Sequence, residues 1–332
     1  MIRPLLGVTV LDFSRIIAGP LCTQYLGDLG AEVIKVENPA GGDDTRWWPP
    51  FADGDGAIFL AMNRNKRSVA VDATCAEGRA VLQDLAARAD VVVEGYGPGV
   101  AEKLGLDYAT LRARNPRLIY CSISGFGPEG PLREKKGFDA ILQAMSGMMA
   151  LTGRPGDGPL RSPFSPIDQA TGMLALSGIL AALLQRQQTD AGLRVDAALF
   201  DTALAFMAYY AQGVWARGED PPRTGNAHES VCPYQVFDTA DQPLMLGIAT
   251  DGLWRRFCRV AGLPQRLASD PHFATNAARV ARRAEVVNLV QSILRTRSCA
   301  EWIRMLDAAG VPCAGINTLA QALAMPHTEA SG

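Results

Sequence analysis

Residues 7–37 read GVTVLDFSRIIAGPLCTQYLGDLGAEVIKVE, and this stretch decides the fold class. A short apolar run over 7–13 precedes a helical pattern from about Pro20 to Leu29, and a second apolar run covers 32–37. Two parallel strands need a long crossover connection between them, usually a helix. The stretch therefore predicts the first unit of a parallel sheet.

The same alternation continues through the first half of the chain. Further strands are predicted at 67–72, 90–95 and 118–126, with a helix over 76–89. The expected fold is a Rossmann-like, doubly wound α/β sheet with helices on both faces, whose ligands bind in the loops after the strands. No GxGxxG follows the first strand, where the loop is SRIIAGP, so a dinucleotide site is disfavoured.

The expected domains are a large sheet domain over 1–190, a linker strand and long helix over 191–225, and a smaller α+β domain over 226–332. Apolar helices over 138–150 and 168–188 complete the large domain. The small domain is expected to contain a hairpin in YQVFDTADQPLMLGIA, the strand PCAGI and helices over 251–261, 279–297 and 299–309.

Composition describes an ordinary globular protein, with 48% hydrophobic and 20% charged residues and a formal charge of −2. This balance argues against nucleic-acid binding. The seven cysteines show no paired spacing, which fits reduced thiols. Without an uninterrupted apolar stretch of about 18 residues or a signal peptide, we expect no membrane span and a cytoplasmic enzyme.

Asp168 is the main catalytic candidate. It lies in RSPFSPIDQATG (161–172), and the chain has only three histidines able to compete for acid–base chemistry. A carboxylate with its usual pKa near ~4 is already ionised at neutral pH and can act directly as a covalent nucleophile. The alternative interpretation is a helix N-cap, and the two are compatible, since a helix N-terminus would keep the carboxylate ionised and support an oxyanion. Asp139 is interpreted as a cap, and Asp12 as a structural hydrogen-bonding residue.

Two basic clusters invite two interpretations each. NRNKRS (63–68) places Arg64, Lys66 and Arg67 just before a strand, and a Lys135–Lys136 pair precedes GFD. Each is either a solvated loop end, which composition alone favours for the first cluster, or a phosphate clamp for a polyanionic ligand. The stretch GNAHESVCPY (225–234) is either a surface loop or a lid.

Together these segments resemble the family III CoA-transferases, also called the CaiB/BaiF family. The later stretch GNAHESVCPYQVF is most similar to the branch acting on dicarboxylates such as succinate and hydroxymethylglutarate. The resemblance spans residue 7 to about 316 and is carried by these collinear stretches: LDFSRIIAGPLCTQYLGDLGAEVIKVENPAGGDDTR, NRNKRSVAVD, DVVVEGYGPG, SISGFGPEGP, GFDAILQAMSGMMALTG, PIDQATGMLALSGILAALLQR and VDAALFDTALA.

The resemblance implies that Asp168 is the catalytic aspartate and that CoA transfer passes through aspartyl anhydride and aspartyl-CoA thioester intermediates. It implies acyl-CoA and a carboxylic acid as substrates, no tightly bound cofactor or metal, and an interlocked homodimer. Gly225, Asn226 and His228 are candidates for contacting substrate or oxyanion. The implied CoA contacts are Arg15, Ile16, Ile17, Ala18, Lys66, Arg67, Tyr96, Lys103 and Lys136.

Three departures from the family pattern matter. Phe138 stands where related racemases carry a histidine, and it cannot shuttle a proton, which favours transfer over an α-methylacyl-CoA racemase or epimerase. Gly95 and Asn38 replace residues that contact CoA in formyl-CoA transferase. The chain also stops at Gly332, before the family's C-terminal return segment, so a non-catalytic CoA-binding remnant is a further alternative.

Overall fold

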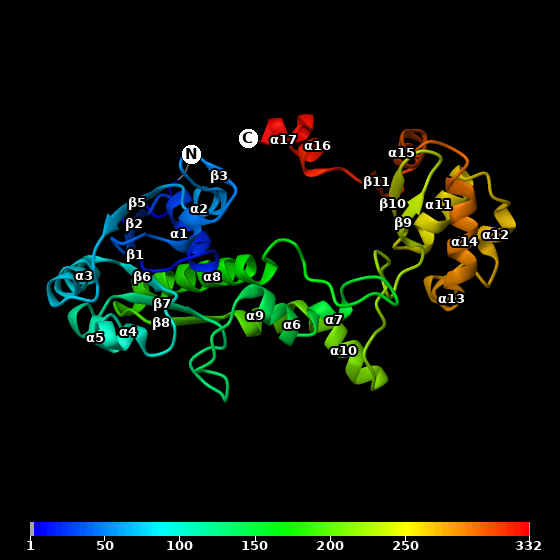
Figure 1. The fold of residues 1–332 in the computed structure, drawn as a ribbon. Helices are drawn as coiled ribbons and strands as arrows, with labels where there is room; N and C mark the ends of the chain where they lie inside the picture. The colour runs from blue at the N-terminus through cyan, green and yellow to red at the C-terminus, as the bar shows by residue number, and fades with distance from the viewer. Residues whose placement is uncertain (1–2, 332) are drawn as a thin grey trace. The chain divides into compact units, whose positions relative to one another are not determined.

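The computed structural model describes residues 3–331 (Figure 1). The chain divides into two compact units, one formed by residues up to 152 together with 159–221, and the other by 153–158 together with residues from 222 onward. Each unit has a hydrophobic core of its own.

The first unit contains the predicted parallel sheet. Its six strands run in the order β5-β2-β1-β6-β7-β8, and every neighbouring pair is parallel. The doubly wound α/β fold is therefore confirmed. The strands are β1 (Thr9–Asp12), β2 (Glu32–Glu37), β5 (Lys66–Ala70), β6 (Val91–Glu94), β7 (Ile119–Ser124) and β8 (Arg194–Ala198).

Helices cover both faces of this sheet. Within β6, Val91 and Val93 belong to the core cluster shared with the apolar helices α1 (Ala18–Asp28) and α8 (Pro166–Thr189). Val92 belongs instead to the cluster shared with α3 (Ala76–Arg88) and α5 (Tyr108–Arg114). Successive strand residues point to opposite faces, so a continuous apolar strand needs a helical layer on each side. A short α4 (Val100–Leu104) lies between β6 and α5 in the sequence.

The segment expected to be a linker differs from its prediction. Residues 194–198 form the edge strand β8, which pairs with β7 over its whole length, so they belong to the sheet. The expected long helix is two helices, α9 (Leu199–Phe206) and α10 (Ala208–Arg217), that meet at Met207. Their apolar composition continued without a break, so the sequence pattern did not reveal the boundary.

Two other parts of the first unit were not predicted. The helix expected over 138–150 is divided into α6 (Asp139–Met145) and α7 (Met148–Leu151) by Gly147, whose φ is +89°. That left-handed backbone ends a helix and suits glycine. An insertion between β2 and β5 carries η1 (Asp44–Trp47), the two-residue strands β3 (Phe51–Ala52) and β4 (Asp55–Gly56), and α2 (Ala57–Met62).

The second unit is the expected α+β structure. The predicted hairpin forms β9 (Tyr234–Asp238) and β10 (Pro243–Gly247), and β11 (Cys313–Gly315) pairs with β10 to complete an antiparallel sheet in the order β11-β10-β9. The helix expected over 279–297 is two helices. The unit's helices are α11 (Asp251–Val260), α12 (Gln265–Ser269), α13 (Asn276–Ala281), α14 (Arg283–Leu294), α15 (Cys299–Ala308), α16 (Leu319–Leu323) and α17 (Pro326–Ser331).

Helix α8 combines unusual length with apolar composition. Among residues 3–331 it is the one helix long and apolar enough to span a membrane, although polar residues interrupt its apolar run. One side of α8 is buried against α1, β7 and β8, as expected of the central helix of a globular domain. Its opposite side exposes Met173, Leu174 and Leu184.

Candidate active site

Asp168 is the third residue of α8, which begins with Pro166 after the N-cap residue Ser165. The N-cap interpretation of Asp168 is therefore wrong. Its carboxyl group is half-buried, and burial together with the nearby Asp139 carboxylate raises its pKa to about 7. The premise of a carboxylate fully ionised at neutral pH is also wrong, because desolvation and a like charge both disfavour the charged form.

Asp139 caps α8 from a neighbouring helix. It is the first residue of α6 and is only 4% exposed. Its Oδ2 accepts hydrogen bonds from the backbone N–H groups of Ile167 (2.8 Å) and Asp168 (3.2 Å). The side chain of Ser165 makes no capping bond, so Asp139 satisfies donors that the first turn would otherwise leave unpaired. Asp139 is thus a cap, as predicted, but of α8 rather than of its own helix.

Gln143 completes this arrangement and is fully buried. Its Nε2 donates to Asp139 Oδ1, and its Oε1 accepts from the backbone N–H of Ser162 at 2.8 Å. The pair therefore joins α6 to the chain that enters α8. We name Asp139 and Gln143 the capping pair.

The capping pair determines which backbone N–H groups at the N-terminus of α8 are free to stabilise a reaction intermediate. Ile167 and Asp168 donate their N–H groups to Asp139, Gln169 donates to Ser165 O, and Pro166 has no N–H. None of these amides is free to hold an oxyanion in this structure. The expected oxyanion support from the helix terminus is therefore absent here.

The face of α8 that carries Asp168 packs against the start of α1 one turn farther along. Asp168 and Gly172 are four residues apart and share one face of α8. A Cβ added to Gly172 would lie 2.5 Å from Ala18 O and 3.4 Å from Cys22 N, so this face of α8 lies directly against the first turn of α1. Only glycine permits so close an approach.

The loop at Arg15–Ala18 is held from beneath by buried charges. Ile16 has φ +75°, a strained conformation for a β-branched residue, and its N–H donates to both Asp43 carboxylate oxygens at 3.4 and 3.3 Å. Lys35 Nζ bonds both Asp43 Oδ2 and Ser14 O at 2.9 Å. Asp43 and Lys35 are each about 1% exposed. This buried pair fixes the loop's conformation.

Three of the predicted CoA contacts gather at the carboxyl edge of the sheet. The rings of Phe13 and Tyr96 lie 6.2 Å apart, which joins the loops after β1 and β6. A Cβ added to Gly97 would lie 3.7 Å from Lys136 Cε. Arg15 is exposed here and pairs with Asp44 at 3.0 Å. The structure thus brings Arg15, Tyr96 and Lys136 to the edge where α8 begins.

Lys66 is placed differently from its prediction. Its side chain is 3% exposed, and its ammonium donates to Asp12 Oδ2 (3.1 Å), Pro20 O (2.8 Å) and Asn63 Oδ1 (2.9 Å). Burial lowers the pKa of Lys66. Burial also raises that of Asp12, but Lys66 and Lys35, with hydrogen bonds from Ser14 and Thr23, outweigh it and hold the Asp12 pKa at about 2. This geometry fits a structural ion pair rather than a phosphate clamp.

The other basic candidates lie on the surface. Arg67 is exposed and pairs with Glu32, and Arg64 pairs with Asp28. Lys103 is exposed on α4. Ile17 is the N-cap residue of α1, and Ala18 is its buried first residue. No CoA contact of any of these residues is tested by the structure, so all remain predictions.

Gly225, Asn226 and His228 belong to the second unit, and their groups are engaged locally. Gly225 N donates to Gly153 O at 2.9 Å, and Asn226 Oδ1 accepts from Val236 N at 3.2 Å. His228 Nδ1 accepts from Ser230 N at 3.1 Å. Their role toward substrate or oxyanion stays a prediction.

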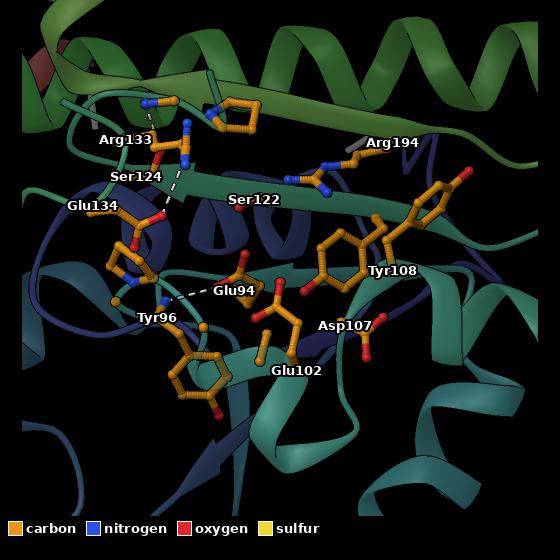
Figure 2. A pocket seen from close by; sticks show the side chains of 17 residues that line it. Glu94, Tyr96, Glu102, Asp107, Tyr108, Ser122, Ser124, Arg133, Glu134 and Arg194 are labelled. Atoms are coloured by element: carbon orange, nitrogen blue, oxygen red, sulfur yellow. Dashed lines mark hydrogen bonds and ion pairs between the residues drawn. The ribbon is translucent and has the colours of Figure 1, made fainter. Parts of the chain in front are cut away.

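A separate cavity of about 270 Å³ opens at the carboxyl ends of β6 and β7. In Figure 2 the carboxylates of Glu94 and Glu102 lie close together, with Arg194 reaching in from β8. Burial, with a contribution from Glu102, raises the pKa of Glu94. Tyr96 lines this cavity, but Asp168 and Lys136 do not, and its carboxylates would repel phosphate groups. Within residues 3–331 no group of three or more histidine, cysteine, aspartate or glutamate side chains is placed to hold a metal ion.

Comparisons with known proteins identify the family and the class of activity. The profile of CoA-transferase family III matches residues 5–332. The chain is 41% identical to succinate–glutarate CoA-transferase of Agrobacterium fabrum, over 99% of this chain and 84% of that one. It is 41% identical to mouse succinyl-CoA:glutarate CoA-transferase, over 96% and 73% respectively. Acetyl-CoA:oxalate CoA-transferase of Acetobacter aceti is 37% identical over 98% and 84%.

Solved structures give the same result. A CaiB/BaiF family protein from Brucella suis superposes with a TM-score of 0.87 and 41% identity, over 100% of this chain and 89% of that chain. A hypothetical protein from Mycobacterium tuberculosis superposes with a TM-score of 0.88 and 34% identity, over 99% and 88%. The chain is a CoA-transferase and belongs to CoA-transferase family III.

Proposed function

We propose that this CoA-transferase moves CoA between two dicarboxylic acids and that Asp168 is its covalent nucleophile. The observation that carries the proposal is the placement of Asp168 on the first turn of α8, on the face packed against Ala18 at the head of α1. The named relatives from Agrobacterium and mouse pair succinate with glutarate. That pairing supports a dicarboxylate as both donor and acceptor acid.

The proposed reaction has four steps and consumes no other reactant. The Asp168 carboxylate attacks the thioester carbonyl and expels CoA thiolate, leaving an acyl–aspartyl anhydride. The thiolate attacks the aspartyl carbonyl, which releases the donor acid and leaves an aspartyl-CoA thioester. The acceptor carboxylate displaces the thiolate to form a second anhydride. The thiolate then attacks the acceptor carbonyl, which gives the new acyl-CoA and regenerates Asp168.

The chain's residues contribute position and charge to these steps. The capping pair holds the first turn of α8, and burial together with the charge of Asp139 raises the pKa of Asp168 to about 7. Anhydrides and thioesters hydrolyse, so the site must exclude water. Gly172 brings α8 close against α1 one turn away from Asp168. This close packing is proposed to exclude water from one side of the reactive carboxylate.

Surface residues at the carboxyl edge are proposed to hold CoA. Arg15, Lys103 and Lys136 present cations that suit its phosphate groups, and Tyr96 offers a half-buried ring beside them. Lys66 acts indirectly in this proposal, because its ion pair with Asp12 supports the strand from which the Ser14–Ile17 loop emerges.

We also propose that the enzyme is a homodimer. Monomers rarely expose large contiguous apolar patches, yet the first unit exposes many large apolar side chains on four helices. In sedimentation velocity we expect a dimer, and Leu204→Glu with Trp215→Glu should dissociate it. The exposed residues are Ile141 and Met145 on α6, Met173, Leu174 and Leu184 on α8, Leu204 and Phe206 on α9, and Tyr209 and Trp215 on α10.

The proposed mechanism is tested by trapping its intermediates. The purified protein is incubated with succinyl-CoA, treated with hydroxylamine and examined by intact and peptide mass spectrometry. We expect a hydroxamate on the peptide containing Asp168, and no such product from Asp168→Ala, which should still bind CoA. Turnover by Asp168→Ala, or a hydroxamate at another carboxylate, would refute the nucleophile assignment. Glutarate added before hydroxylamine should discharge the aspartyl-CoA thioester of the wild-type protein and so reduce the yield of hydroxamate.

A further inference from the structure

The second unit contains a cavity whose lining includes none of the candidate site residues described above. It measures about 670 Å³ and lies between α11 and α12, with the turn at Gly262 joining its two walls. All of its lining residues come from the segment 255–269, so the site is complete within one unit. They are Arg255, Cys258, Arg259, Gly262, Leu263, Gln265, Arg266, Ala268 and Ser269.

Three arginines give this cavity a single sign of charge. Arg255 and Arg259 are one turn apart on α11 and therefore share a face, and Arg266 comes from α12. No carboxylate lines the cavity. Within residues 3–331, none of the three guanidinium groups has a hydrogen bond or an ion pair. Other arginines of this unit do, such as Arg279 with Asp251 at 3.0 Å.

The remaining lining residues suit an organic body. Leu263 and Ala268 are apolar, and Cys258 is 1% exposed. Burial raises the pKa of Cys258 to about 11, so its thiol is neutral at physiological pH. A Cβ added to Gly262 would meet nothing within 4 Å, so the rim is open there. The volume falls within the range of about 300–1,000 Å³ found for small-molecule sites.

We propose that this cavity binds a small organic polyphosphate, with phosphate oxygens on the three arginines and the organic body on the apolar floor. A guanidinium presents planar paired donors that match phosphate oxygens, and three unpaired cations favour a ligand with two or more negative charges. Because field lines of one sign concentrate in a cleft, the cavity attracts such anions. A free nucleotide and the nucleotide end of CoA share this chemistry.

The test is isothermal titration calorimetry on the full chain with ADP, CoA and citrate. Arg255→Ala/Arg266→Ala removes one cation from each wall. Arg88→Ala/Arg304→Ala is the matched control, since both residues are exposed and lie outside the cavity. Ser269→Glu is a second variant, which places a carboxylate in the lining without removing an arginine. Thermal melts establish that each variant folds.

We expect saturable ADP binding below 1 mM that weakens at least tenfold in Arg255→Ala/Arg266→Ala and in Ser269→Glu, and less than twofold in the control. If wild type binds CoA at two sites per chain and the cavity variants bind it at one, the ligand of the cavity is the nucleotide end of CoA. ADP binding alone at the cavity would identify a free nucleotide. Absence of ADP and CoA binding at the cavity, an equal loss in the control, or citrate binding as tight as that of ADP would overturn the proposal.

Discussion

The charge of Asp139 is expected to set the pH dependence of the reaction through Asp168. Burial is the larger cause of the rise in the Asp168 pKa from 3.8 to about 7, and Asp139 is the other. The share of Asp139 is therefore less than half of about three pH units. Removing its charge should lower the Asp168 pKa by about one unit, equivalent to ~1.4 kcal/mol.

The simple variant Asp139→Asn would disturb more than charge. Asp139 accepts hydrogen bonds on both carboxylate oxygens, from two backbone amides and from Gln143. An asparagine would replace one of these carboxylate oxygens with an NH₂ group, which would face another hydrogen-bond donor. A buried polar group without a partner costs about 1–3 kcal/mol, so this variant should lose stability as well as alter the pKa.

The double variant Asp139→Asn/Gln143→Glu preserves every hydrogen bond. The Oδ1 of the introduced asparagine accepts from the α8 amides, and its Nδ2 donates to one oxygen of the introduced glutamate. The second oxygen of that glutamate accepts from Ser162 N, as the Gln143 amide oxygen does in wild type. The negative charge then lies one helical turn farther along α6. We expect stability near that of wild type, with the Asp168 pKa lowered.

The assay is the pH dependence of kcat/KM for CoA transfer from succinyl-CoA to glutarate. Since the ionised carboxylate is the nucleophile, the rate should rise with pH through the Asp168 pKa, whose midpoint lies near pH 7 in wild type. In the double variant this midpoint should fall by less than the unit expected for complete removal of the charge, because the charge is moved one turn away rather than removed. The ¹³C chemical shift of the Asp168 carboxyl group should titrate with the same change. An unchanged midpoint by both measurements in a folded protein would refute the electrostatic role of Asp139.

Other predictions follow from the same geometry. Gly172→Ala places a Cβ 2.5 Å from Ala18 O, so it should separate α8 from α1 and lower kcat at least tenfold, whereas Ala170→Gly should not. Lys66→Met leaves the buried Asp12 carboxylate without its ion-pair partner, so it should lower the free energy of unfolding in urea by about 3 kcal/mol. Lys136→Ala should weaken CoA binding without loss of stability. Asp168→Asn should raise stability above pH 7 by about 2 kcal/mol and by nothing below pH 4, because the raised pKa of Asp168 favours its neutral form. An equal gain at both pH values would contradict that last expectation.

Periodicity predicted the main elements because they obey local rules. The strands of residues 7–37 and the helix between them lie close to their expected bounds. Continuous apolar strands need helices on two faces, so the doubly wound architecture followed from composition. Boundaries inside long apolar segments did not follow. The breaks at Gly147 and Met207 depend on where the chain must turn to pack, and the same apolar residues continue on both sides.

The sequence by itself determined the fold class, the family resemblance and the identity of Asp168 as the reactive candidate. Only the tertiary structure decided the chemical state of that residue. A pKa depends on burial and on charges brought together in space, and Asp139 lies 29 positions away along the chain. Lys66 gives a second example. A lysine in a run of basic residues is expected on the surface, but in the folded chain its ammonium is buried against Asp12. Local patterns specify elements, but partners and solvation are properties of the packed fold.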